Sequence, residues 1–383
     1  MKKILFLLPI IALFLTTTCK KNSYDVNPPI SMEEEGTAIN PIDNDLKQMA
    51  TLCSMAYVSE NDPSTLEDSL VYIINQINLA TSDRWYVVWY GIDNSNSTVA
   101  YVAKSTKYTH TFALIIRGEE YKNLVNTVEG IDVFALNDYE FHNNKQISNP
   151  KVAIGPYLAF KELINLVGED RLSFEKKTFT KFFQERFNDG NSVGKPINLY
   201  LAGHSTGGNM ATLALPYFVQ LMENGMLSNK SPLYIGGFSF GTPSIYTPEF
   251  VDFFNSKLLQ YNDLKENLII DYQRIFNPND LFPIVFYGNF NGINDLNYPV
   301  SPDLGSAINS TIGRIGKVIK DKGIEYKPIL KSGSSKVTKV PFTALVPDDL
   351  PNPIVSLNGY LQHVGFNHDI NNYIKALGAN PPR

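Results

Sequence analysis

The pattern of hydrophobic and polar positions divides the chain into an apolar leader, a polar stretch and a long series of alternating elements. An apolar run from residue 4 to residue 15 follows Lys2 and Lys3. This order is typical of a signal peptide, and the run is shorter than the roughly 20 apolar residues that a membrane-spanning helix needs. Residues 20–41 are polar, contain Pro28 and Pro29, and show no apolar period, so a tether is predicted there.

Apolar positions then recur at spacings of three and four from Asp43 to Tyr57, which predicts a helix with Cys53 on its apolar face. A buried thiol is the favoured interpretation of Cys53, because nothing nearby would activate it. Asp62-Pro63 predicts the start of a second helix that ends near residue 80. Three short runs rich in β-branched and aromatic residues predict strands, at 85–92, 98–103 and 111–116.

Strands and helices alternate in the second half of the chain. Helices are predicted near 157–166 and 174–187, and the order strand, helix, strand, helix, strand follows at 197–202, 209–222, 233–240, 248–259 and 269–276. This order predicts an α/β fold class with a mostly parallel sheet covered by helices on both faces. Residues 287–353 are rich in Gly, Pro, Asn and Ser, and we interpret them as an insertion with one helix at 306–322.

Composition and charge narrow the class of protein. Hydrophobic residues make up 43% of the 383 residues and charged residues 19%, which excludes disorder as the global state. The formal net charge of −5, with no long basic run, argues against nucleic acid as a partner. Only two cysteines are present, so a disulfide framework is excluded.

Two segments match the pattern G-x-S-x-G, one around Ser205 and one around Ser239. A nucleophile elbow needs a strand, a tight turn between small residues, and then a helix. Ser205 follows a predicted strand, has glycines on both sides and precedes a predicted helix. Ser239 lies between two phenylalanines, and Pro243 discourages a helix after it. Ser205 is therefore predicted as a nucleophile, and Ser239 as a structural strand residue.

A serine nucleophile needs a histidine base and a carboxylate that orients the base. His204 adjoins the nucleophile and cannot easily curl back to it, while His110 and His142 precede it in the chain, against the order expected of α/β-hydrolases. The base is therefore one of the two later histidines, His363 or His368. Asp280, in the turn after the strand at 269–276, is the predicted acid, since functional groups gather past the carboxyl ends of parallel strands.

Several separated blocks together resemble the class 3, or fungal-lipase-like, serine esterases. The blocks are the elbow at 200–208, the strand at 238–243, and residues 274–283, which are similar to the family block that carries the triad acid. His368 followed by Tyr373 resembles the terminal H-x-x-x-x-Y element, which favours His368 over His363. Residues 112–118 resemble the strand that ends in F-R-G-T in the family.

The resemblance implies an α/β-hydrolase-like fold and a carboxylic-ester hydrolase with Ser205, Asp280 and His368 as its triad. It implies no metal and no organic cofactor, and a lipid or other ester as substrate. The backbone N–H groups of Thr206 and Glu119 would form the oxyanion hole. Glu119 stands where the family commonly has Ser or Thr, and its side chain is expected to point away from the hole. Residues 119–150 lie where relatives carry a lid, although an ordinary surface helix and loop is an equal alternative.

The small residues before Cys19 resemble a bacterial lipobox, in which the chain is cut before the cysteine and its thiol carries a lipid. This resemblance predicts a signal peptide at 1–18, a lipidated tether at 19–42 and one hydrolase domain at 43–383. The protein would be exported to the bacterial cell envelope and anchored to a membrane through Cys19. An ordinary signal peptide, with Cys19 incidental, is the alternative.

Two other functions stay open at this stage. The first is an inactive hydrolase-fold lipoprotein that binds at the surface, for which the unusual Glu119 would be evidence. The second is a peptidase or acyltransferase, because triad chemistry does not name the leaving group or the acceptor. Acyl-chain length, head group and oligomeric state are likewise not determined by the sequence.

Overall fold

The computed structural model describes residues 45–57, 85–93, 98–108, 110–118, 131–141, 149–188, 195–227, 233–264, 268–286, 300–329, 336–339, 350 and 353–381. The leader, the tether and the helix predicted at 61–80 lie outside these residues.

Nine strands form one mixed sheet in the order β11-β10-β9-β8-β3-β2-β1-β6-β7. The first five of these strands are mutually parallel, so their carboxyl ends lie along one edge of the sheet. The predicted mostly parallel sheet is found in this half. Its strands are β3 (Thr111–Ile116), β8 (Ile197–His204), β9 (Leu233–Phe240), β10 (Leu268–Phe276) and β11 (Lys336–Lys339).

The other half of the sheet is antiparallel. From β3 outward, each of the remaining strands pairs antiparallel with its neighbour. They are β2 (Val99–Ser105), β1 (Trp85–Ile92), β6 (Val167–Asp170) and β7 (Glu175–Thr178). A separate two-stranded sheet joins β4 (Leu136–Asp138) to β5 (Lys151–Ala153).

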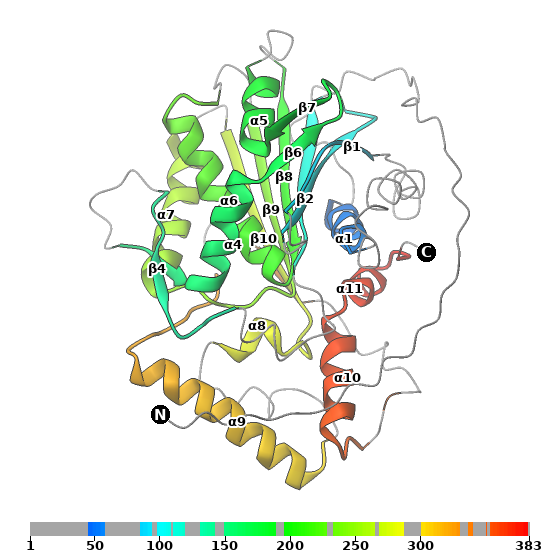
Figure 1. Cartoon of the computed structure of the whole chain (residues 1–383), viewed down its shortest axis with the longest axis vertical. Coiled ribbons are helices and arrows are strands. Elements are labelled where there is room, and N and C mark those ends of the chain that lie inside the picture. Colours follow the sequence, from blue (N-terminus) through cyan, green and yellow to red (C-terminus); the bar gives the residue numbers. More distant parts are fainter. Residues whose placement is uncertain are drawn as a thin grey trace. The chain divides into compact units, whose positions relative to one another are not determined.

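Helices cover both faces of the large sheet and bury a hydrophobic core on each side (Figure 1). Side chains alternate along β3, so that Phe112 and Leu114 enter one core while Ala113 and Ile115 enter the other. The first core is covered by α4 (Ile154–Asn165), α5 (Phe179–Phe187), α6 (Thr206–Glu223) and α7 (Pro248–Leu264). The second is covered by α1 (Asp45–Met55) and α11 (Ile370–Ala376).

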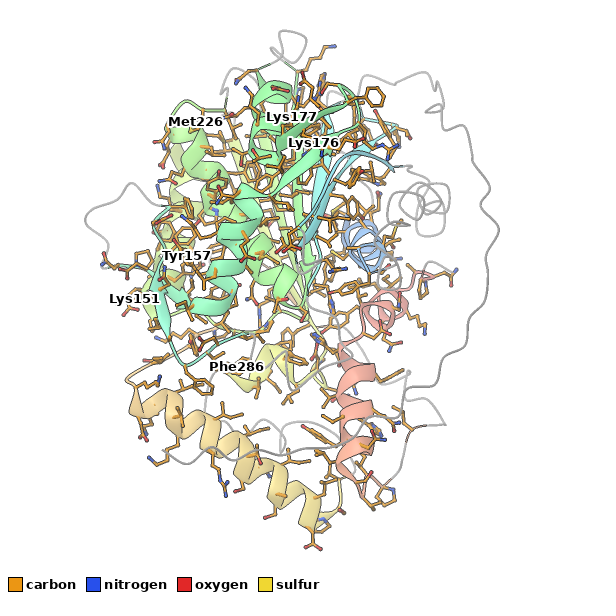
Figure 2. All side chains as sticks on the ribbon, viewed as in Figure 1. Lys151, Tyr157, Lys176, Lys177, Met226 and Phe286 are labelled. Carbon is orange, nitrogen blue, oxygen red and sulfur yellow. The ribbon has the colours of Figure 1, made fainter. Side chains whose placement is uncertain are left out.

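One predicted helix is shorter than expected. The helix predicted at 174–187 begins only at Phe179, and residues 175–178 form β7, which pairs with β6. Phe174 has a φ of 59°, which interrupts helical geometry, and the Thr178 hydroxyl accepts the Lys181 N–H as the helix cap. Lys177 on β7 (Figure 2) is buried against carboxylates, including that of Asp170 at 3.1 Å.

The predicted insertion contains elements that pack on the domain. Its helix α9 (Pro302–Asp321) begins four residues before the predicted start, and β11 extends the large sheet beside β10. The Tyr326 hydroxyl donates to the Val133 carbonyl oxygen at 2.8 Å, which ties the segment after α9 to the β4 region. Helices α8 (Phe282–Val285), α9 and α10 (Leu357–His368) lie beyond the carboxyl ends of the parallel strands (Figure 1). Among the helices of the described ranges, none is both long and apolar enough to cross a membrane.

Candidate active site

Ser205 occupies the sharp turn between β8 and α6. Its backbone angles, φ 57° and ψ −129°, are costly for a residue with a side chain and hold Ser205 at the head of the helix. The Ser205 N–H donates to the Phe240 carbonyl oxygen at 2.9 Å, which ties the turn to the neighbouring strand β9. A Cβ atom on Gly207 would collide with the Ile116 carbonyl oxygen, so only glycine permits this close approach of α6 to β3.

The last residue of α10 brings an imidazole to this serine. Nε2 of His368 lies 2.9 Å from Ser205 Oγ, and both side chains are buried. His363, the alternative base, lies earlier on the same helix and is also buried. The structure thus brings His368 into hydrogen-bonding contact with the predicted nucleophile.

Asp280 supports the imidazole from the opposite side. Oδ2 of Asp280 lies 2.8 Å from His368 Nδ1 and accepts the Tyr373 hydroxyl at 2.7 Å. Its Oδ1 accepts the Phe282 N–H at 3.0 Å. Because a carboxylate only accepts, Nδ1 of His368 carries the proton and Nε2 is left to accept from Ser205. The fully buried carboxylate therefore sets the tautomer that a general base requires.

Two residues hold the turn that carries Asp280. Nη2 of Arg274 donates to the Pro283 carbonyl oxygen at 2.8 Å, across the turn. Nδ2 of Asn277 donates to Asn367 on α10, 3.0 Å from its backbone oxygen and 3.0 Å from its side-chain oxygen. The turn is thereby fixed to the helix that ends in His368.

His204 lies beside the candidate base His368. Its ring centroid is 4.6 Å from that of His368, and its Nε2 lies 2.7 Å from the His368 carbonyl oxygen. Burial, and then the neighbouring His368, lower the pKa of His204 well below its usual value. His204 is therefore a neutral side chain that packs against the catalytic candidate.

Only one of the two predicted oxyanion donors is described. Thr206 is the first residue of α6 and is buried, so its N–H lies at the positive end of an 18-residue helix, where a developing anion is favoured. Glu119 and the proposed anchor Cys19 lie outside the described residues. Gly118, the residue before Glu119, packs against Ser205.

Two further side chains singled out in the sequence, Ser239 and Cys53, are buried and do not belong to the group formed by Ser205, His368 and Asp280. Ser239 is fully buried, and its hydroxyl lies 2.7 Å from the hydroxyl of Tyr272, as expected of a structural serine. Cys53 is buried in the second core, where burial raises the pKa of its thiol. Within the described ranges, no group of three or more His, Cys, Asp or Glu side chains could hold a metal ion.

Sequence reasoning missed one residue of the site. The sequence predicts Tyr57 on the apolar face of the first helix, yet its hydroxyl lies 2.9 Å from His204 Nδ1. The only signal in the sequence is a tyrosine at the end of an apolar stripe, which ordinarily indicates a core residue.

Part of the chain matches the model of a known protein family. The family model described as Lipase (class 3) matches residues 114–290, a segment that contains Ser205 and Asp280 but ends before His368. The fold is that of an α/β-hydrolase, and the matched segment is similar to lipases. Residues 114–290, somewhat less than half of the chain, are similar to the class 3 lipase family.

Solved structures support the fold. The crystal structure of M37 lipase has a TM-score of 0.63 and 19% identity, and the match covers 86% of this chain and 92% of that one. Two further structures each have a TM-score of 0.42. A triacylglycerol lipase from Penicillium expansum is 19% identical, and the match covers 63% of this chain and 72% of that one. Lipase II from Rhizopus niveus is 20% identical, and the match covers 62% of this chain and 71% of that one. The fold assignment therefore rests on M37 lipase, and no curated protein matches the chain in sequence. The predicted α/β-hydrolase-like fold is confirmed.

The match to the lipase family model supports a general reaction class and no specific substrate. The protein is a carboxylic-ester hydrolase of the lipase class.

Proposed function

We propose that Ser205, His368 and Asp280 form the catalytic triad of this hydrolase and that its substrates are lipid esters. The single observation that carries the proposal is the unbroken chain of contacts from Ser205 Oγ through the His368 ring to Asp280, at 2.9 Å and 2.8 Å. Its three members come from three separate elements and are all buried, and the serine is held in a strained turn. Such a conformation persists only where the surrounding structure enforces it.

The reaction follows from these contacts. Ser205 Oγ attacks the ester carbonyl carbon while His368 Nε2 takes its proton, and Asp280 stabilises the imidazolium that forms. The oxyanion of the tetrahedral intermediate lies at the N-terminus of α6, where the Thr206 N–H and the predicted Glu119 N–H would donate to it. His368 returns the proton to the leaving alcohol as the C–O bond breaks, which leaves an acyl group on Ser205. Water then attacks the acyl carbon while His368 takes its proton, and His368 returns this proton to Ser205 Oγ as the bond between Oγ and the acyl carbon breaks and the acid leaves.

Apolar side chains beside the base are consistent with an acyl substrate. The ring of Phe282 lies 4.3 Å from the ring of His368, and Leu281, Val285 and Phe286, on or next to α8, are buried in the first core. Phe286 lies at the end of this helix, beyond the sheet (Figure 2). A partly dehydrated site of this kind strengthens the electrostatic interactions on which the triad depends.

The direct test is Ser205→Ala, assayed with nitrophenyl esters of short and long acyl chains. We expect kcat to fall by a factor on the order of 10⁶, because the nucleophile is removed. Thr212→Ser, on the same helix α6 but within a buried hydrogen-bond network, is the matched control and should retain activity. Turnover by S205A equal to that of the parent chain would contradict the mechanism.

Covalent labelling distinguishes an active hydrolase from a binding protein that has the hydrolase fold but no catalytic activity. A fluorophosphonate probe should modify Ser205 covalently in the folded chain, and His368→Ala should abolish the labelling. A folded chain that takes up no label would indicate a hydrolase-fold protein without catalysis. A profile of activity against acyl-chain length, above and below substrate aggregation, then distinguishes lipids from small esters.

We also propose that the protein is exported and anchored to a membrane of the bacterial cell envelope through a lipid on Cys19. The apolar leader and the small residues before Cys19 support this proposal. Metabolic labelling with a radioactive fatty acid should mark the full chain and not the Cys19→Ser variant. Equal labelling of both chains would rule out Cys19 as the anchor.

A further inference from the structure

Tyr57 reaches the site from the face of the sheet that α1 and α11 cover. It follows α1, and its N–H donates to the Ser54 carbonyl oxygen at 3.2 Å, which continues the last turn of that helix. Its hydroxyl lies 2.9 Å from Nδ1 of His204 and accepts the Gly118 N–H at 3.1 Å. One hydroxyl therefore contacts two segments that come from different strands.

The direction of each hydrogen bond can be assigned. His204 Nε2 faces the His368 carbonyl oxygen, which can only accept, so Nε2 carries the ring proton. Because burial keeps His204 neutral, its Nδ1 has a free lone pair. The Tyr57 hydroxyl therefore donates to Nδ1 at 2.9 Å, a closer acceptor than the His204 carbonyl oxygen at 3.4 Å, and its oxygen accepts from Gly118. The result is a continuous chain of hydrogen bonds from the Gly118 N–H, through the Tyr57 hydroxyl and the His204 ring, to the backbone carbonyl oxygen of His368.

Both ends of this series lie beside the reacting atoms. A Cβ atom on Gly118 would lie 3.0 Å from Cβ of Ser205 and 2.7 Å from the Tyr57 hydroxyl, so the Gly118 backbone packs directly against the nucleophile. Gly118 is also the last residue before Glu119, the predicted oxyanion donor. At the other end, the His204 ring is in contact with the ring of the base His368.

We propose that Tyr57 is a positioning residue for ester hydrolysis, whose hydroxyl holds the Gly118 backbone and the His204 ring in fixed places around Ser205 and His368. The inference rests on the proposed triad. The segment that follows α1 contributes none of the triad residues. The inference gives this segment a role in positioning the groups that react. Because transition-state stabilisation requires donors and base to be preorganised, a shift of either segment lowers the rate of the chemical step more than it weakens substrate binding.

The test is Tyr57→Phe, which keeps the ring and its edge contact with His204 and removes only the hydroxyl. We expect kcat to fall about 10- to 100-fold with KM within about twofold, since small misplacements cost this much. Affinity for an alkyl boronic acid, which mimics the tetrahedral intermediate, should fall by a similar factor. Rates are expressed per Ser205 titrated by the fluorophosphonate, so that misfolded chain is not counted.

Tyr101→Phe is the matched control. The Tyr101 hydroxyl is buried and donates to the Leu52 carbonyl oxygen on the same helix α1, at 2.6 Å, without contacting the site. A purely structural role for Tyr57 would make the two variants alike, with lower thermal stability and unchanged kcat. That result would overturn the inference. Should Tyr57→Phe unfold, the comparison is repeated with Gly313→Ala, which fills open space on α9, added to both variants.

The same measurements distinguish the inference from the function on which it rests. If S205A keeps the turnover of the parent chain, the proposed catalytic function is refuted, independently of the kcat measured for Tyr57→Phe. An inactive S205A together with kcat and boronic-acid affinity of Tyr57→Phe within twofold of the parent would leave the triad in place and refute only the role of Tyr57.

Discussion

The hydroxyl oxygen of Ser205 and Nε2 of His368 lie 2.9 Å apart although 163 positions separate the two residues in the chain. The first follows β8, an inner strand of the sheet, and the second is the last residue of α10. Asp280, from a third element, completes the contact. A site assembled from such distant pieces depends on the packing that joins them.

Asp280→Asn should lower kcat by about four orders of magnitude. The Phe282 N–H and His368 Nδ1–H both require an acceptor, on Oδ1 and Oδ2 respectively. The amide of asparagine has only one oxygen acceptor. Its NH₂ group therefore either faces the Phe282 N–H or faces Nδ1 of His368, and in the second case His368 takes the tautomer with its proton on Nε2. Steady-state kinetics with a nitrophenyl ester measures the effect. Asp321→Asn, at the exposed end of α9, is the control and should leave kcat unchanged.

Tyr373→Phe should reduce both stability and activity, but activity much less than Asp280→Asn does. The hydroxyl donates to Asp280 and accepts the Asn277 N–H at 3.0 Å, so its loss leaves a buried N–H unsatisfied. We expect the free energy of unfolding in urea to fall by about 1–3 kcal/mol. Tyr326→Phe, which loses a buried hydrogen bond far from the triad, should lose similar stability with no change in kcat. Equal kcat for both variants would count against the role of Tyr373.

Gly207→Ala should destabilise the fold by about 3 kcal/mol. The added methyl group would lie 2.7 Å from the Gly118 N atom and 2.8 Å from the Arg117 carbonyl carbon, both backbone atoms that cannot move aside. Gly313→Ala, on an exposed helix with no atom within 4 Å of its Cβ, should instead stabilise the chain by about 0.5–1 kcal/mol. Thermal unfolding of the two variants checks the opposite signs.

Stability should decline as the pH falls below about 6.5, partly because of His204. The pKa of this histidine is lowered in the folded chain, mainly by burial, so the unfolded chain binds a proton there that the folded chain does not. Stability therefore rises with pH through this window, at a rate of at most about 1.4 kcal/mol per unit for one group. His204→Gln should flatten the slope of unfolding free energy between pH 5 and 6.5. An unchanged slope in urea titrations would contradict this prediction.

Much of the fold could be predicted because each element is encoded locally. The strand at 233–240 and the strand at 85–92 are found with the predicted bounds, since continuous apolar or β-branched runs bounded by turn residues rarely form anything else. The hairpin of β6 and β7 was missed because its strands have only four residues each, and one of them, with two lysines, lacks an apolar pattern. Pairing between strands, not local preference, makes those residues extended.

The sequence by itself determined the elbow at Ser205, through a strand, small residues and a helix that are contiguous in the chain, and it limited the base to two later histidines. The tertiary structure alone decided which atoms meet: His368 with Ser205, Tyr373 with Asp280, and Tyr57 with His204. The physical reason is that periodicity specifies which face of an element is buried, whereas distances between side chains follow from how the faces pack. A hydroxyl on an apolar face, like that of Tyr57, acquires its partners only after α1 docks against the sheet.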